Sequence, residues 1–288
     1  MTVPLIFDYH AVRQHRTRAV AQQKSITPLL EATADILLDR LDDVSRRFTS
    51  ALDIGGRGLI TKALLQRDIP VVSLDFSIDF SLAQAKKAPS SAPSSVAICA
   101  DMDTLPFKAH SFDLVMAHLS LHWVNDLPGI LRQICHILQP DGLFLASIPI
   151  VPTLQPLRVA LEEAELALRG GVSPRISPLP THYSCVTLMQ RAGFALPLID
   201  REVVNIRYRT LRALVSDLRA AGETNALTLR DRTPPPRALF PLAAATLENT
   251  EEGYFATPLH MAILSGWAPD PSQPQTQKTL KTPFKPSF

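Results

Sequence analysis

The 288-residue sequence lacks the marks of several functional classes. Its three cysteines, Cys99, Cys135 and Cys185, have no metal-type spacing, so we expect reduced thiols in a reducing compartment. No apolar run is long enough to span a membrane, and no N-terminal stretch is built like a signal peptide. The formal net charge of +2 gives no basis for strong nucleic-acid binding.

Several catalytic patterns are missing as well. The sequence has no Ser-His-Asp spacing, no P-loop and no cysteine cluster. His118 and His122 are four residues apart, a spacing found in metal-binding helices, but Asp126 is the one acid nearby. The sequence therefore predicts no metal site.

A glycine-rich turn followed by regularly placed acids is what the sequence does contain. An apolar run ends in Asp53 and leads into three glycines within residues 55–58. Asp75 ends the next apolar run 22 residues later, and Asp101 follows the third run. A strand that leads through glycines into a helix lets backbone N–H groups approach a ligand. An acid at the tip of the next strand suits a ribose diol. The order therefore predicts an adenosine-containing ligand.

Apolar runs rich in Val, Ile and Leu alternate with helical patterns between residues 51 and 149. This alternation is typical of parallel βαβ units covered on both faces. We expect an α/β fold with a doubly wound, Rossmann-like, seven-stranded, mostly parallel sheet, helices on both faces and helical substrate-side insertions. The expected strands are 51–55, 71–75, 95–100, 112–118, 142–149, 198–209 and 257–268.

The domain organisation follows from shifts in these patterns. We expect an N-terminal helical cap over residues 1–48, built from a basic helix before residue 24 and a second helix at 28–47. The main domain is predicted at 49–268, with substrate-side insertions at about 150–190 and 210–250. Residues 269–288, rich in Pro, Gln, Thr and Lys, are predicted to be a disordered tail.

Several segments carry a family resemblance. LDIGGRG, ADMDTLPF, FDLVMAHLSLHWVNDLPGIL and LQPDGLFLASIP resemble class I S-adenosylmethionine-dependent methyltransferases. IFDYHAVRQHRTRA, GGVSPRISPL and DLRAAGETNAL resemble one branch of that family. This branch contains the mitochondrial complex I assembly factor and the malonyl-carrier-protein methyltransferases of biotin synthesis. The resemblance covers roughly residues 5–268, although the glycine loop is one residue shorter than the usual D-x-G-x-G-x-G.

The resemblance implies an S-adenosylmethionine site. The residues implied to bind the cofactor are Asp53, Gly55, Gly56, Gly58, Asp75, Asp101, Met102 and His118. Asp53 and the loop backbone would face the methionine part, Asp75 the ribose, and Asp101 with the Met102 backbone the adenine. His118 would line the methyl-donor pocket and is the candidate base. Two alternatives stay open: Asp53 as a cap of the following helix, and His118 as a buried, hydrogen-bonded residue.

Substrate contacts are expected from two groups of polar residues. Arg16 and Arg18 suit a carboxylate on the cofactor or on a partner, or else form a solvated helix face. A polar cluster at the end of an otherwise apolar helix faces the substrate cleft or caps that helix. Its members are Asp217, Arg219, Glu223 and Asn225.

Three functional hypotheses follow. The first is a methyltransferase acting on a small molecule or a protein, since methyl transfer depends on proximity and orientation more than on a strong base. The second, from the closer resemblance, is hydroxylation of an arginine on a complex I subunit, as reported for the mitochondrial assembly factor. The third, suggested by the short loop, is a non-catalytic assembly factor with a degenerate cofactor site. The expected location is the cytoplasm, with peripheral association at the inner membrane as an alternative.

Overall fold

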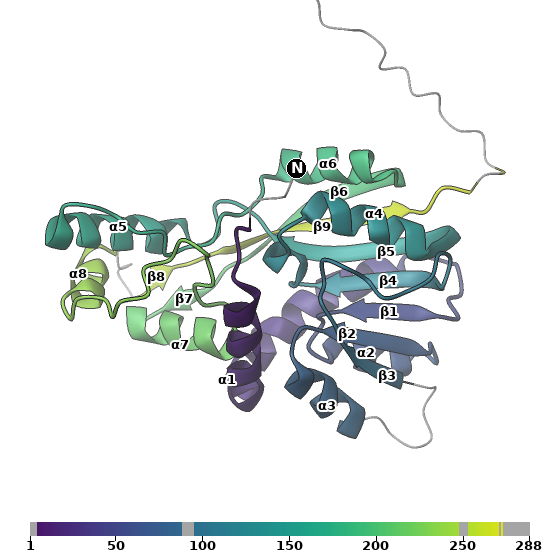
Figure 1. Ribbon diagram of the computed structural model, residues 1–288, viewed down its shortest axis with the longest axis horizontal. Coiled ribbons are helices and arrows are strands. Elements are labelled where there is room, and N and C mark those ends of the chain that lie inside the picture. The colour runs from purple at the N-terminus through teal and green to yellow at the C-terminus, as the bar shows by residue number, and fades with distance from the viewer. Residues whose placement is uncertain (1–4, 88–94, 248–252, 271, 273–288) are drawn as a thin grey trace, which may run out of the picture.

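A seven-stranded sheet forms the centre of the computed structural model, which describes residues 5–87, 95–247, 253–270 and 272 (Figure 1). The strand order is β3-β2-β1-β4-β5-β9-β6. Neighbours from β3 to β5 are parallel, and β9 is antiparallel to both β5 and β6. The strands are β1 (Ala51–Ile54), β2 (Val71–Asp75), β3 (Ser95–Cys99), β4 (Phe112–His118), β5 (Leu138–Pro149), β6 (Ala195–Val204) and β9 (Leu259–Trp267). The predicted fold class is confirmed, whereas most of the predicted tail lies outside the described residues.

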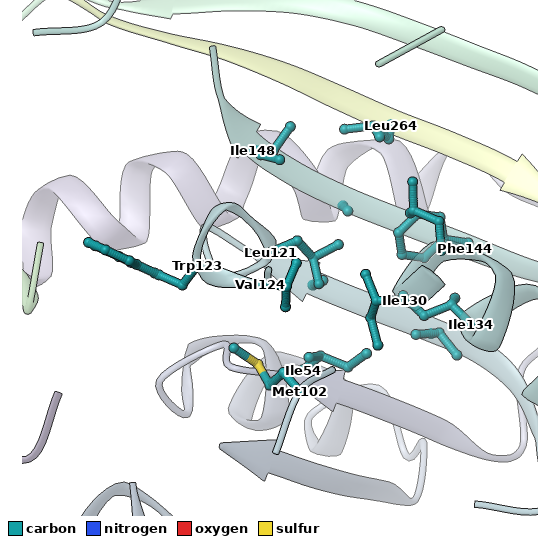
Figure 2. Packing of buried hydrophobic residues seen from close by; sticks show 14 of the residues in the cluster. Ile54, Met102, Leu121, Trp123, Val124, Ile130, Ile134, Phe144, Ile148 and Leu264 are labelled. Carbon is teal, nitrogen blue, oxygen red and sulfur yellow. The ribbon is translucent and has the colours of Figure 1, made fainter. Parts of the chain in front are cut away.

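Both faces of the sheet are buried under helices. The flanking helices are α1 (Tyr9–Asp42), α2 (Leu59–Leu65), α3 (Ile78–Lys87), α4 (Leu127–Ile137) and α6 (His182–Ala192). Side chains alternate between the faces of a strand, so Leu114 and Met116 of β4 join a core with α1 and α2. Val115 between them joins the core with α4 and α6, where Figure 2 shows Ile130 and Ile134 beside Phe144 of β5. The continuous apolar runs of the sequence are explained by this double burial.

α1 is one 34-residue helix, whereas the sequence predicts two helices separated near residues 25–27. It begins after Asp8, whose carboxylate accepts hydrogen bonds from the first turn, and it continues through Pro28. A proline inside a helix costs about 3 kcal/mol. That cost is offset because Leu30, Leu37 and other apolar residues on both sides of the proline are buried along the same helix.

A second layer extends beyond the carboxyl edge of the sheet (Figure 1). Its elements are α5 (Gln155–Arg169), β7 (Arg207–Tyr208), α7 (Leu211–Ala221), α8 (Leu239–Thr246) and β8 (Phe255–Ala256). They share an apolar cluster of their own. The strand expected at 198–209 is split, because β6 ends at Val204 and β7 leaves the main sheet to pair with β8. Among the described helices, none is both long enough and apolar enough to cross a membrane.

Candidate functional site

The glycine turn follows β1 and depends on the absence of side chains. Gly55 and Gly58 have φ of +67° and +83°, which favour glycine. A Cβ on Gly56 would lie 2.2 Å from Oδ1 of Asp53. The buried Asp53 carboxylate accepts hydrogen bonds from the Gly56 N–H (3.1 Å), the Thr61 N–H (3.1 Å) and the Thr61 hydroxyl (2.7 Å). Burial raises the pKa of Asp53 to about 6. These contacts are those of the helix-capping alternative, and the cofactor role of Asp53 stays a prediction.

Asp75 ends β2 beside this turn, and Arg16 of α1 occupies its carboxylate. The Arg16 guanidinium donates to both carboxylate oxygens, with 3.1 Å from Nε to Oδ1, and also to the carbonyl of Gly55 at 3.1 Å. The N–H of Ser77 donates to Oδ1 at 2.9 Å. Both side chains of this ion pair are only 1% exposed. Arg16 is therefore not part of a solvated helix face, and it contacts the two elements predicted to hold the cofactor.

The third guanidinium nitrogen of Arg16, Nη1, tests whether S-adenosylmethionine fits this site. Nη1 is buried and, among the described residues, has no hydrogen-bond partner. A buried donor without a partner costs about 1–3 kcal/mol. A carboxylate placed between Arg16 and the glycine turn would supply the missing acceptor. The donor set therefore fits the amino-acid end of S-adenosylmethionine.

The remaining predicted cofactor residues differ in how far they are exposed to solvent. Asp101 is exposed on the loop after β3, where its carboxylate accepts from the N–H of Asp103 (2.9 Å), and Met102 is fully buried. His118 at the end of β4 is also fully buried, and its Nε2 lies 3.0 Å from the hydroxyl of Thr33. Burial and the nearby Arg57 lower the pKa of His118 to about 3, so its ring is neutral. Its predicted role as a base is untested by this arrangement.

A buried network links the glycine turn to the second layer. Arg57, in the turn, donates to the carbonyls of Leu119 and Ala221 (both 3.2 Å) and to Glu223 (2.7 Å). Glu223 also accepts from Nε2 of His122 at 2.8 Å and from Nε1 of Trp123 at 3.0 Å.

The charges of this network are balanced within it. Burial would raise the pKa of Glu223, but His122, Arg57 and Arg16 outweigh it, and the pKa falls to about 2. Burial and Arg16 lower the pKa of Arg57 to about 10. Three donors already occupy the Glu223 carboxylate. Glu223 therefore holds the surrounding side chains in place and has little free charge to offer a substrate.

An apolar cavity of about 1070 Å³, a volume that includes open solvent at its mouth, lies between this network and the second layer. Leucines and isoleucines of α1, α7 and the segments after β5 and β6 form much of its wall. Its polar groups include Arg57, His122 and Glu223, and an Asp217 carboxylate that accepts from the hydroxyl of Tyr208 at 3.1 Å. We name this space the apolar cavity.

A second cavity of about 1200 Å³ adjoins it and is lined by basic side chains. Arg18 and Arg219 lie on its wall, together with His15. Asn225 lines both cavities and donates to the carbonyl of Pro174 at 2.8 Å. We name this space the basic cavity. Four of the predicted substrate residues thus line this cavity, namely Arg18, Arg219, Glu223 and Asn225. Asp217 lines the apolar cavity instead, and Arg16 lies at Asp75.

Sequence reasoning missed the roles of three side chains. From the sequence, His122 is considered only for its spacing from His118, and Arg57 and Trp123 receive no individual role. A lone arginine among glycines, next to an apolar strand, is the signal that could have identified Arg57 as a buried charge in need of a partner. Within the described part of the chain, no group of three or more His, Cys, Asp or Glu side chains is arranged to hold a metal ion.

Comparisons with known proteins agree with this architecture. A family model described as "Methyltransferase domain" matches residues 52–146. The mitochondrial arginine-hydroxylase NDUFAF5 of Homo sapiens is 34% identical over 273 residues, or 93% of this chain and 78% of that protein. The malonyl-[acyl-carrier protein] O-methyltransferase of Xylella fastidiosa (strain M23) is 31% identical over 279 residues, or 95% of this chain and 92% of that protein. The solved structure of YcgJ from Bacillus subtilis, at 13% identity, has a TM-score of 0.58 over 81% of this chain and 98% of that one, a likeness of fold alone.

Proposed function

Because the chain belongs to the class I S-adenosylmethionine-dependent methyltransferase family, we propose that it binds this cofactor at the carboxyl edge of β1, β2 and β3. The single observation that carries the proposal is the buried Arg16, with an unpartnered Nη1, held between Asp75 and the glycine turn. The bound sulfonium supplies an electrophilic methyl group. The acceptor lies in the apolar cavity, which begins at Arg57 of the same turn.

Each predicted cofactor residue has a role in this proposal. Asp75 accepts from the ribose hydroxyls, and Asp101 with the Met102 backbone binds the adenine. The glycine turn, kept in shape by Asp53, lets the backbone approach the amino-acid part. Arg16 binds the carboxylate of that part.

The chain's own contribution to catalysis is orientation. Alignment of acceptor and donor supplies much of the rate of such a displacement. Arg57 fixes the turn relative to Glu223 and thus to the cavity wall, while the apolar lining excludes water from the acceptor. If the methyl acceptor releases a proton, a base must take it up, and His118 is the proposed base.

A second candidate is modification of an arginine side chain, and Asp217 favours it. Its carboxylate lies on the apolar wall with Tyr208 as a hydrogen-bond donor, and an arginine offers a guanidinium head on an apolar stem. The printed name of the NDUFAF5 relative assigns it arginine hydroxylation. By this likeness the partner is a complex I subunit, met in the cytoplasm or at the inner membrane surface. Intact-mass analysis of that subunit from a deletion strain tests it, because an unchanged mass contradicts the candidate.

The main proposal is tested by calorimetric titration with S-adenosylmethionine. We expect binding by the wild type and a loss of at least about tenfold in Asp75→Asn, since a charge-assisted hydrogen bond is removed. Asp79→Asn, which changes an exposed acid on α3 nearby, is the matched control and should bind as the wild type does. Labelled methyl transfer to candidate acceptors follows. Absent binding by a folded wild type overturns the proposal and favours the non-catalytic assembly role.

A further inference from the structure

The apolar and basic cavities adjoin each other. Six residues line both of them, namely Arg175, Ile176, Leu218, Glu223, Thr224 and Asn225. Figure 1 shows α1 beside α7, and these two helices supply walls to both cavities. A ligand that passes the six shared residues would contact both cavities.

One face of α1 runs along both cavities. His15, Arg18 and Gln22 line the basic cavity, and Ile26 and Leu29 line the apolar cavity. These positions are spaced by three or four residues, so they lie on one side of the helix. From Arg18 to Leu29 the helix rises roughly 16 Å at 1.5 Å per residue. The wall therefore changes from basic to apolar over the length of an extended small molecule.

The charges at the basic end are not balanced by acids among the described residues. Arg18 and Arg219 are exposed on the cavity wall, and among the described residues neither guanidinium has a hydrogen-bond or ion-pair partner. The acids nearby are engaged, since Glu223 holds Arg57 and His122, and Glu165 holds Arg175 at 2.6 Å.

His15 reports the resulting positive potential. Burial lowers its pKa, and the charges of Arg18 and Arg230 lower it further, although Asp8 and a hydrogen bond to Thr224 act in the opposite direction. Its buried Nδ1 has no hydrogen-bond partner in the part of the chain that the structure describes. An anion at this end would lie beside two free guanidiniums and a partner-deficient imidazole.

The basic cavity also has an apolar side. Leu157 and Leu161 of α5, Val215 of α7 and the partly exposed Phe240 of α8 line it. A free inorganic anion would leave this surface in contact with water. A chain attached to the anion would cover it and continue past Leu218 into the apolar cavity.

We infer that the two cavities together bind an amphipathic small-molecule anion, a phosphate or carboxylate carried on an aliphatic chain. The anionic group lies at Arg18 and Arg219, and the chain runs along α1 toward Arg57. The inference names an acceptor class for the proposed function and rests on it in that respect, but ligand binding can be measured without the cofactor.

Calorimetry of the full chain with octyl phosphate, below its micelle concentration, tests the inference. We expect binding at least tenfold tighter than that of inorganic phosphate, octyl glucoside or octyltrimethylammonium. The double variant Arg18→Gln and Arg219→Gln should lose at least tenfold in affinity for octyl phosphate. Arg13→Gln with Arg212→Gln changes exposed arginines of the same two helices outside both cavities and should bind as the wild type does.

Two results would overturn the inference. Equal affinity for the phosphate, glucoside and ammonium probes would mean unspecific apolar adsorption. Retention on phosphatidylglycerol vesicles through the same two arginines, without binding of the monomeric probe, would mean a membrane surface instead. If S-adenosylmethionine fails to bind while octyl phosphate binds as expected, only the proposed enzymatic function falls.

Discussion

Arg16 and Asp75 are 59 residues apart in the sequence and form a buried, two-point ion pair across α1 and β2. A carboxylate offers about four acceptor sites. Three donors, two from Arg16 and one from Ser77, already use the Asp75 carboxylate. A ribose diol bound to Asp75, as proposed, would bring two more donors, so Arg16 would have to give up part of its contact with Asp75.

The first prediction separates the two ends of the cofactor. In Arg16→Gln we expect S-adenosylmethionine to bind about tenfold or more weakly, because the carboxylate loses a charged partner. Methylthioadenosine, which has no carboxylate, should bind more tightly, because Asp75 is then free for the ribose. Calorimetric titration of both ligands measures this, with thermal melting to verify the fold. Tighter binding of both ligands would mean that Arg16 only occupies the cofactor site and does not bind the carboxylate.

The second prediction concerns pH and Glu223. Its pKa falls from an ordinary 4.5 to about 2 in the folded state, so the ionised carboxylate stabilises the fold above about pH 4.5. This contribution, at most about 3 kcal/mol, is lost as pH falls toward 2. Denaturant unfolding should show Glu223→Gln markedly less stable than the wild type at pH 5. At pH 2.5 the difference in unfolding free energy between the two should be smaller. A gap that is independent of pH would contradict the prediction; Glu162→Gln, an exposed acid of α5, is the control.

The third prediction tests the glycine turn. Gly56→Ala places a Cβ 2.2 Å from Oδ1 of Asp53, which must move and loosen its contacts with Thr61. We expect a loss of about 1–3 kcal/mol in unfolding free energy, typical of overpacking. Gly171→Ala is the matched control, since no atom lies within 4 Å of its added Cβ. Equal stability of the two variants in urea would show that the turn is not constrained by Asp53.

The fourth prediction concerns His118. Its buried, neutral ring bonds to Thr33, so His118→Gln should lower the unfolding free energy by about 1–3 kcal/mol. Because His118 is the proposed proton acceptor, we also expect methyl transfer by the folded variant to slow by about a hundredfold or more. Thr33→Val, which removes the same hydrogen bond and keeps the ring, should give a similar loss of stability with a much smaller loss of rate. A His118→Gln rate within severalfold of the wild type would contradict the proposed base and leave His118 a buried structural residue.

Local sequence patterns predicted the centre of the sheet well because β1, β2, β4 and β5 are largely buried, apolar runs. The glycines and acids at the strand ends were predicted for the same reason, since their place follows from the strand itself. The exceptions arise where tertiary packing overrides a local signal. Two helices were predicted before residue 24 and at 28–47, but the buried face of α1 continues through both. The alternating run at 198–209 did not reveal that β7 pairs with β8.

The buried ion pairs were beyond such reasoning. Arg57 and Glu223 are 166 residues apart, and only the fold brings them together. Arg16 looked like a member of an exposed basic cluster, because its neighbours Arg13 and Arg18 are indeed exposed. Which residue of a basic helix turns inward depends on the acid that faces it, and Asp75 is on a different element.

The unbroken course of α1 has a consequence for the order of events. Three residues of this one helix contact different parts of the site. Arg16 contacts the predicted cofactor edge, Gln23 donates to the carbonyl of Arg57 at 3.2 Å, and Leu29 lines the apolar cavity. A shift of α1 that frees Asp75 must also reshape the acceptor wall. The two ligands are then thermodynamically coupled, and each should change the affinity of the other by the same factor.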